Sequence, residues 1–178
     1  FGPKLAGAGG FINISQNAKK VVFVGTFGAG RLRVQAADGR LTVLEEAKAR
    51  KFVEAVEHVT FSGKFAAARG QGVLYVTERC VFALRPDGLE LIEVAPGIDI
   101  ERDILALMDF RPIVRGDPMP MDERIFREGP MELREDLLSI PLDQRFIYDP
   151  QQNLFFVNLE HFALRSRARR KRSRRRLW

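Results

Sequence analysis

The stretch that decides the fold is VLYVTERCVFALRPDGLELIEV, residues 73–94. It opens with β-branched and aromatic residues at 73–77. Two further apolar runs, 80–84 and 89–94, flank the turn residues Pro86-Asp87-Gly88. An Asp-Gly pair between apolar runs is a strong hairpin signal. The stretch therefore predicts one strand followed by an antiparallel hairpin.

The sequence predicts more β-structure on the N-terminal side of this stretch. Residues 20–27 are typical of a buried strand, and residues 32–44 of a hairpin around Asp38-Gly39. Alternation at 59–61 predicts another strand, and residues 64–69 predict one or two helical turns.

On the C-terminal side, Asp99 is placed to cap a helix at residues 100–108, whose apolar side chains fall on one face. Proline-rich loops follow, and the apolar run 153–159 predicts a last strand. Because strands outnumber helices, the sequence predicts an α/β fold with a mixed open sheet and few covering helices.

Length and composition predict one globular domain. The chain has 178 residues, of which 46% are hydrophobic and 29% charged. That length suffices for one core but is short for two domains. No apolar stretch approaches the ~20 residues of a membrane span, so we expect no membrane partner. The single cysteine, Cys80, excludes an internal disulfide and favours a cytoplasmic location.

The net charge of +6 is concentrated at the C-terminus. Residues 163–178 contain nine of the 29 basic side chains and no acid, which leaves 20 basic against 23 acidic residues elsewhere. A basic run binds nucleic-acid phosphates through counterion release, but like charges at this density repel one another and stay disordered. A solvated tail is the expectation, and binding of nucleic acid or an acidic partner is the alternative.

A glycine-dense loop precedes the first predicted strand. It consists of Gly7, Ala8, Gly9, Gly10 and Phe11. Closely spaced glycines let backbone N–H groups approach a ligand. The loop lacks the third glycine of a dinucleotide-binding fingerprint. From the pattern alone, a tight structural turn and a ligand-contacting loop both stay open.

Other catalytic or metal-binding patterns are weak. The only histidines, His58 and His161, lie far apart and form no recognisable ligand set with Cys80, so we expect no metal site. Cys80 lies among apolar neighbours, which favours a buried structural thiol. Glu78, beside Arg79, is interpreted as a paired charge at a turn.

Six segments, in order along the chain, form a pattern that is also found in a known family. They are FGPK at 1–4, GGFINISQ at 9–16, VGTF at 24–27, VTFSG at 59–63, LYVTER at 74–79 and APGID at 95–99. Together they closely resemble the acyl-CoA:acetate/3-ketoacid CoA-transferases, including the propionate CoA-transferase type. The resemblance covers about residues 1–164.

The resemblance implies an α/β fold of the NagB/RpiA/CoA-transferase-like type, present as an incomplete domain from the C-terminal, β-subunit-like half of the enzyme. Members of the family move coenzyme A from an acyl-CoA to acetate or another short-chain or 3-keto acid. A glutamate attacks the thioester and gives a mixed anhydride, then a glutamyl-CoA thioester. No cofactor is implied beyond the coenzyme A thioester that serves as substrate.

The resemblance also implies which parts of the site this chain holds. In the family the glutamate precedes the glycine loop, in a Glu-x-Gly-like segment that no residue here matches, so we expect no nucleophile and no activity of the chain alone. The resemblance places the loop of Gly7, Ala8, Gly9, Gly10 and Phe11 at the oxyanion and the coenzyme A channel, where fixed N–H donors stabilise a tetrahedral intermediate. The implied partners are an acyl-CoA, a short-chain carboxylate, and an α-like N-terminal half or further copies of the chain.

The resemblance ends near residue 164. A family member would continue there into an amphipathic helix, whereas this chain becomes rich in arginine. We therefore expect residues 1–164 to form the family part and residues 165–178 a basic tail. Two alternatives stay open. One is a non-enzymatic module that binds through the tail, and the other is a degenerate structural subunit that pairs with an α-like partner.

Overall fold

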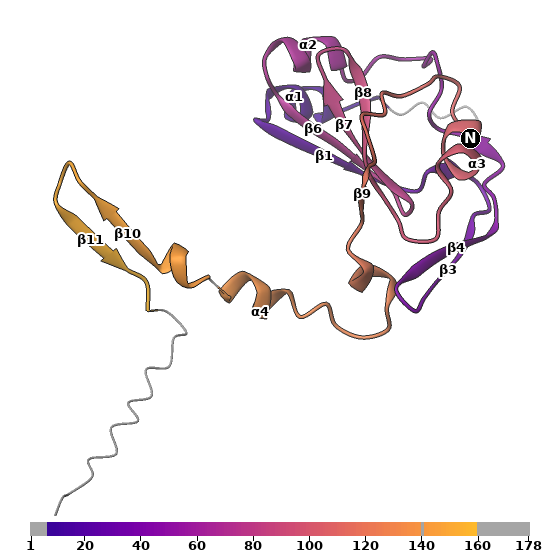
Figure 1. Cartoon of the computed structure of the whole chain (residues 1–178). Coiled ribbons are helices and arrows are strands. Elements are labelled where there is room, and N and C mark those ends of the chain that lie inside the picture. The colour runs from indigo at the N-terminus through magenta and orange to yellow at the C-terminus, as the bar shows by residue number, and fades with distance from the viewer. Residues whose placement is uncertain (1–6, 140, 160–178) are drawn as a thin grey trace, which may run out of the picture. The chain divides into compact units, whose positions relative to one another are not determined.

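The structure, a computed structural model, describes residues 7–139 and 141–159 (Figure 1). Contacts divide the chain into two compact units, with the division between Pro130 and Met131. The expected boundary between residues 164 and 165 lies outside the described residues, as does the basic tail, so both stay predictions.

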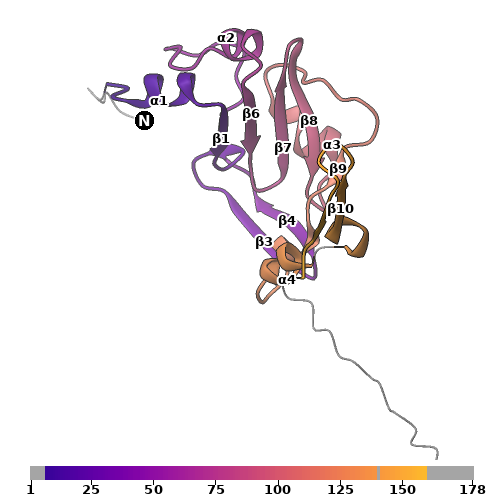
Figure 2. The ribbon, with the colours of Figure 1, turned by 90° about the vertical axis from the view of Figure 1, so that its left-hand side faces the viewer.

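The first unit is built on a five-stranded mixed sheet. Its strands are β1 (Lys20–Val24), β6 (Gly72–Val76), β7 (Cys80–Arg85), β8 (Gly88–Val94) and β9 (Met119–Pro120), in the order β1-β6-β7-β8-β9. β1 is parallel to β6, β7 is antiparallel to both β6 and β8, and β9 is parallel to β8. Figure 2 shows β6, β7 and β8 side by side. The predicted strand and hairpin of residues 73–94 are confirmed.

Short elements complete the first unit. The strands are β2 (Gly28–Ala29), paired with β5 (Ala49–Arg50), and β3 (Arg33–Ala37), paired with β4 (Arg40–Glu45). The helices are α1 (Phe11–Asn17), α2 (Gly63–Ala68), α3 (Ile100–Asp103) and the 3-10 helices η1 (Leu105–Leu107) and η2 (Glu123–Phe126). The hairpin around Asp38-Gly39 is confirmed, and both turn residues have positive φ, 53° and 75°, as a two-residue turn of type I′ requires.

The sheet carries a hydrophobic cluster on each face. One contains Phe27, Cys80, Phe82, Leu91, Ile104 and Met108, and the other contains Leu41, Val81, Ala95, Met121 and Phe126. Successive side chains of a strand point to opposite faces, which is why Cys80 and Phe82 belong to one cluster and Val81 to the other. The positions of Phe27, Tyr75 and Phe52 at the first cluster matter most for the site.

The structure corrects three predictions about elements. The buried strand predicted at 20–27 ends at Val24, and it is an edge strand with alternate side chains exposed. Residues 59–61 form bends instead of a strand, and their apolar character is explained by Phe61, whose ring packs edge-on at 5.2 Å against Phe23. The Asp99 cap is confirmed by a 2.8 Å hydrogen bond from the Arg102 N–H. The helix itself ends at Asp103, because Ile104 (φ −123°) leaves the helical region before a 3-10 turn follows. Helix α1 was not predicted, since Gly10 provides no capping side chain.

The second unit is small. It contains α4 (Leu133–Leu138), the 3-10 helix η3 (Leu142–Arg145) and a hairpin of β10 (Phe146–Asp149) and β11 (Leu154–Val157). β11 confirms the predicted last strand, whereas β10 was not predicted. The rings of Phe146 and Phe155 stack at 5.9 Å across the hairpin. In both units, no described helix is long and apolar enough to cross a membrane.

Candidate functional site

The carboxyl ends of β1 and β6 form the candidate site. The two strands are parallel neighbours, so Gly25-Thr26-Phe27 and Thr77-Glu78-Arg79, which follow them, leave the same edge of the sheet. The Gly25 N–H donates to the Val76 carbonyl at 3.1 Å and extends the pairing past the last ladder residues. In open α/β sheets, ligands bind outside the carboxyl ends of the strands. This edge is therefore the first place to look for chemistry.

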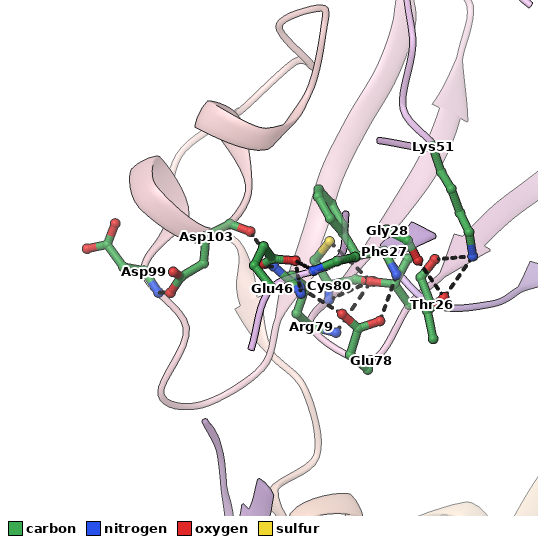
Figure 3. Close-up of polar contacts among 12 residues, drawn as sticks. Thr26, Phe27, Gly28, Glu46, Lys51, Glu78, Arg79, Cys80, Asp99 and Asp103 are labelled. Carbon is green, nitrogen blue, oxygen red and sulfur yellow. Dashed lines mark hydrogen bonds and ion pairs between the residues drawn. The ribbon is translucent and has the colours of Figure 1, made fainter. Parts of the chain in front are cut away.

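A fully buried arginine organises one side of this edge (Figure 3). The Arg79 side chain has no exposed surface, and its Nε donates to Glu78 at 2.7 Å. Its terminal nitrogens donate to both carboxylate oxygens of Glu46, at 2.8 and 3.0 Å, and to the Asp103 carbonyl at 2.9 Å. The guanidinium also lies 4.8 Å from the ring centre of Phe27, a cation–π contact. The structure thus confirms Glu78 as a paired charge at a turn.

This arginine centre braces the exits of both strands. The second carboxylate oxygen of Glu78 accepts a 2.7 Å hydrogen bond from the Phe27 N–H, so one carboxylate joins the end of β1 to the end of β6. Burial lowers the pKa of Arg79, but its hydrogen bonds to Glu46 and Glu78 outweigh burial and leave the pKa above its ordinary value. Burial likewise raises the pKa of Glu46, and the hydrogen bonds and charge of Arg79 together with the Ala47 N–H outweigh it, so that pKa lies below its ordinary value. Both groups are charged at neutral pH and engaged with each other.

Cys80 is structural, as the sequence predicts. The side chain has no exposed surface, and burial raises the pKa of its thiol to about 12. The Thr77 hydroxyl donates to the Cys80 carbonyl at 2.8 Å and accepts from the Cys80 N–H at 3.0 Å, which fixes the turn into β7. A thiol with so high a pKa is not a nucleophile at neutral pH.

An open hollow of about 310 Å³ lies at the same edge of the sheet. Three rings line it, from Phe23, Tyr75 and Phe52, and those of Phe23 and Tyr75 stack at 5.1 Å. At its polar side, the Lys51 amine donates to the carbonyl and to the hydroxyl of Thr26, at 2.8 and 2.7 Å (Figure 3). No carboxylate of the described residues forms an ion pair with Lys51. The hollow therefore combines an apolar wall with an uncompensated positive charge.

A larger hollow of about 520 Å³ lies over Glu46, Arg102 and Asp103. Its charges are already compensated. Arg102 donates to Asp103 at 2.7 Å and holds the pKa of that carboxyl below its usual range, and Glu46 is held by Arg79. Of these two hollows, only the smaller is lined by a charged group without an opposite partner among the described residues, and we place the candidate site there.

The predicted glycine loop lies at the start of α1 and is exposed. Gly9 has a φ of +55°, and a Cβ added at Gly7 or Gly9 would meet no atom within 4 Å. Gly10 is the N-cap of α1, and the Phe11 N–H donates to the Ala8 carbonyl at 3.1 Å. The loop is thus an accessible tight turn, and its contact with an oxyanion stays a prediction.

Phe11 connects this loop to the hollow. Its ring lies 6.1 Å from that of Phe23, and Phe23 lines the hollow. For metal ligands, the described residues contain no group of three His, Cys, Asp or Glu side chains able to hold an ion. His161 lies outside the described residues.

Sequence reasoning missed three residues of the site, Glu46, Lys51 and Phe52. They belong to a charged stretch that forms no long element, and their partners Arg79, Thr26 and Phe82 lie far away in the sequence. No local pattern marks such residues. The signal nearest to them was VGTF at 24–27, which ends at the strand exit where Lys51 binds.

Comparison with known proteins shows which proteins this chain resembles. No protein-family model matches the chain. Acetate CoA-transferase YdiF from Escherichia coli O157:H7 is 48% identical over 131 residues, which is 74% of this chain and 25% of the relative. Caffeate CoA-transferase from Acetobacterium woodii is 50% identical over 127 residues, 71% of this chain and 24% of the relative.

Solved structures agree with these relatives. The crystal structure of the acyl-CoA transferase YdiF from Escherichia coli O157:H7, in a thioester complex with CoA, matches with a TM-score of 0.69 and 48% identity. It covers 72% of this chain and 25% of that one. The chain is therefore similar in sequence and in fold to CoA-transferases over about three quarters of its length. The predicted CoA-transferase-like α/β fold is confirmed, and the chain spans about a quarter of the length of the relatives it matches.

Proposed function

We propose that this chain is the C-terminal portion of an acyl-CoA:carboxylate CoA-transferase, which moves coenzyme A from an acyl-CoA to a short-chain, 3-keto or aryl acid through a glutamyl-CoA thioester. The observation that carries the proposal is 47–50% identity to named CoA-transferases over about three quarters of the chain. The names of the relatives, acetate and caffeate CoA-transferase, support a small carboxylate as acceptor.

In this proposal the chain supplies part of the site and lacks the nucleophile. The attacking glutamate belongs to a Glu-x-Gly-like segment that the sequence does not contain. The chain contributes the exposed loop at residues 7–11 and the strand exits at Thr26 and Thr77. N–H groups of the loop serve as oxyanion donors, which contribute on the order of 3 kcal/mol in comparable acyl-transfer sites. No further cofactor takes part.

The partner in this proposal is the polypeptide that supplies the other three quarters of a CoA-transferase, and β1 is the surface it covers. β1 is an edge strand, paired within the described residues with β6 alone. Its outer face exposes Val22 and Val24, the latter by 78%. Apolar edge strands that stay uncovered pair with other chains, and the length missing relative to the family members is the material that would cover this one.

Complementation tests the function. The purified chain is expected not to exchange CoA between acetyl-CoA and propionate, as measured by chromatography of the acyl-CoA products. Co-expression of this chain with the remaining three quarters of the Escherichia coli relative is expected to produce CoA transfer. Borohydride reduction of the enzyme thioester would then modify a glutamate of the added polypeptide. Turnover by the chain alone, or a modified glutamate within it, would refute the assignment of the nucleophile.

An edge-strand variant tests the partner surface. Val22→Lys places a charge on the exposed face of β1 and is expected to abolish complementation, because the charge would be buried at the interface. Val56→Lys, at an exposed apolar position in a loop (58% against 48% for Val22), is the control and should leave complementation intact. Equal effects of the two variants would argue against β1 as the covered edge. Binding through residues 165–178 stays an alternative for that segment alone.

A further inference from the structure

The hollow beside Lys51 has the features of a binding site for a specific class of ligand. It joins an aromatic wall to a single cation at the carboxyl edge of a parallel strand pair. Pockets of about 300 Å³ and above, with a few placed polar groups in an apolar lining, are the usual size for small-molecule sites. Neither the loop at residues 7–11 nor the arginine centre accounts for this cation.

We infer that the hollow of Phe23, Phe52, Tyr75 and Lys51 binds the acceptor acid, with the carboxylate on the Lys51 ammonium and an aryl or short acyl group against the three rings. The inference rests on the proposed function, because it assigns the acceptor of that reaction to named residues. It is a statement about binding and needs no step of bond formation.

Lys51 is equipped to hold an anion. An ammonium has three donors, and the structure uses two, on the carbonyl and the hydroxyl of Thr26. These two contacts aim the amine at the strand exit and leave one N–H for a ligand. Tyr75 also lines the hollow, and within the described residues its hydroxyl makes no hydrogen bond, which leaves a second donor. A carboxylate accepts from two donors at once.

The rings explain the selectivity for an apolar body. The Phe23 and Tyr75 rings stack at 5.1 Å, and Phe52 packs at 4.9 Å against Phe27 and at 5.0 Å against Phe82. The wall is thus rigid and joined to the core. An aryl group gains both apolar burial and ring–ring contact there. A neutral amide of the same shape keeps the ring contact but loses the charge, so carboxylate and amide are distinguishable.

Gly25 controls access to the amine. A Cβ added there would lie 3.8 Å from Lys51 Nζ, and no other atom is nearer, so the backbone leaves space next to the cation. The φ of Gly25 is not in the left-handed region, since it is absent from the positive-φ glycines of the described chain. A larger side chain at this position can therefore fill the space without backbone strain.

The test is a titration of the isotope-labelled full chain with benzoate and with benzamide, followed by amide chemical shifts. We expect benzoate to shift the amides of Gly25, Thr26 and Lys51. Relative to benzoate on the parent chain, the affinity should be at least about tenfold weaker for benzamide, and at least about tenfold weaker for benzoate on the Lys51→Met variant. That is the loss expected for one charge-assisted hydrogen bond. Lys48→Met, at an exposed lysine three residues away, is the matched control and should bind as the parent does. Gly25→Leu should abolish binding while Lys51 remains.

The outcomes of this titration test the binding site separately from the complementation experiment, which tests the function. Equal affinity for benzoate and benzamide, no effect of Lys51→Met, or shifts confined to residues away from this edge would each overturn the inference. If the complemented enzyme transfers CoA but benzoate leaves these amides unmoved, the subsite is wrong and the function stands. If benzoate binds as expected but complementation yields no transfer, the binding site stands and its role as acceptor site is withdrawn.

Discussion

Arg79 and Lys51 are cations at the same edge of the same sheet, and their surroundings are opposite. Arg79 has no exposed surface, donates to two carboxylates and a carbonyl, and makes a cation–π contact with the Phe27 ring. Lys51 is exposed and contacts only Thr26 with its amine among the described residues. The difference separates a charge that holds the fold from one that is available to a ligand. Pairing and burial, and not the presence of charge, distinguish the two.

Removal of the buried cation is expected to have the largest effect. Arg79→Met leaves Glu78 and Glu46 without their partner, and loss of one member of a buried ion pair costs about 3 kcal/mol or more. We expect the free energy of unfolding in urea to fall by at least that amount, or the chain to fail to fold. Arg111→Met, which removes an exposed ion pair to Glu101, is the control and should cost about 1 kcal/mol or less.

A triple variant without the three charges tests the same prediction if Arg79→Met does not fold, and we call it the compensated variant. Replacement of Arg79 by Met together with Glu46→Gln and Glu78→Gln removes all three charges. It should recover part of the lost stability, because neutral partners leave no unpaired buried charge. If the single and the compensated variants are equally unstable, the centre acts through packing and the contrast with Lys51 fails.

Cys80 reports whether the arginine centre is closed. Burial raises its pKa from 9.0 to about 12, which lowers the thiolate fraction at pH 8 by about a thousandfold. The thiolate is the reactive form, so we expect the native thiol to react with a disulfide reagent at pH 8 at least about a hundred times more slowly than the thiol of the urea-unfolded chain. Rapid labelling of the native protein would show that the Thr77–Arg79 turn opens readily.

The arginine centre also predicts a pH dependence. The folded pKa of Glu46 lies below its ordinary value of 4.5, so its pairing stabilises the protein fully above about pH 5 and is lost as the pH falls through the folded pKa. The unfolding free energy should therefore decrease as the pH falls below about 5. The decrease should be smaller in Glu46→Gln than in the parent, and Glu54→Gln, at an exposed position, should leave it unchanged. Identical slopes in the parent and in Glu46→Gln would remove Glu46 from the centre.

The local part of the fold was predictable from the sequence. The Asp38-Gly39 turn determines its hairpin by backbone conformation, and Pro86-Asp87 form the turn of the next hairpin, in which Gly88 already pairs with Arg85. Asp99 caps a helix through the N–H of Arg102, three residues further along the chain. These are interactions between near neighbours. The prediction of a strand at 59–61 was wrong. Alternation of apolar and polar residues does not distinguish a paired strand from a loop that packs one ring on the sheet, as Phe61 packs on Phe23.

The site was predictable only in part. The VGTF and LYVTER segments lead to its edge, and Glu78 with Arg79 are adjacent in the sequence, so that pair was recognised. The Arg79–Glu46 and Lys51–Thr26 contacts join residues 33 and 25 positions apart through the crossover between β1 and β6. Such contacts depend on the parallel pairing of two strands, which propensity and spacing do not reveal.

Removal of the exposed cation should have the smallest effect on stability. The Lys51 amine donates two short hydrogen bonds to Thr26, but all three groups are accessible to water. Water replaces such contacts, and exposed substitutions usually change stability by about 0.5 kcal/mol or less. We therefore expect Lys51→Met to unfold in urea at nearly the midpoint of the parent. A loss comparable to that of Arg79→Met would mean that Lys51 holds the exit of β1 as Arg79 holds that of β6, and the amine would then be structural, with no distinction left between the two cations.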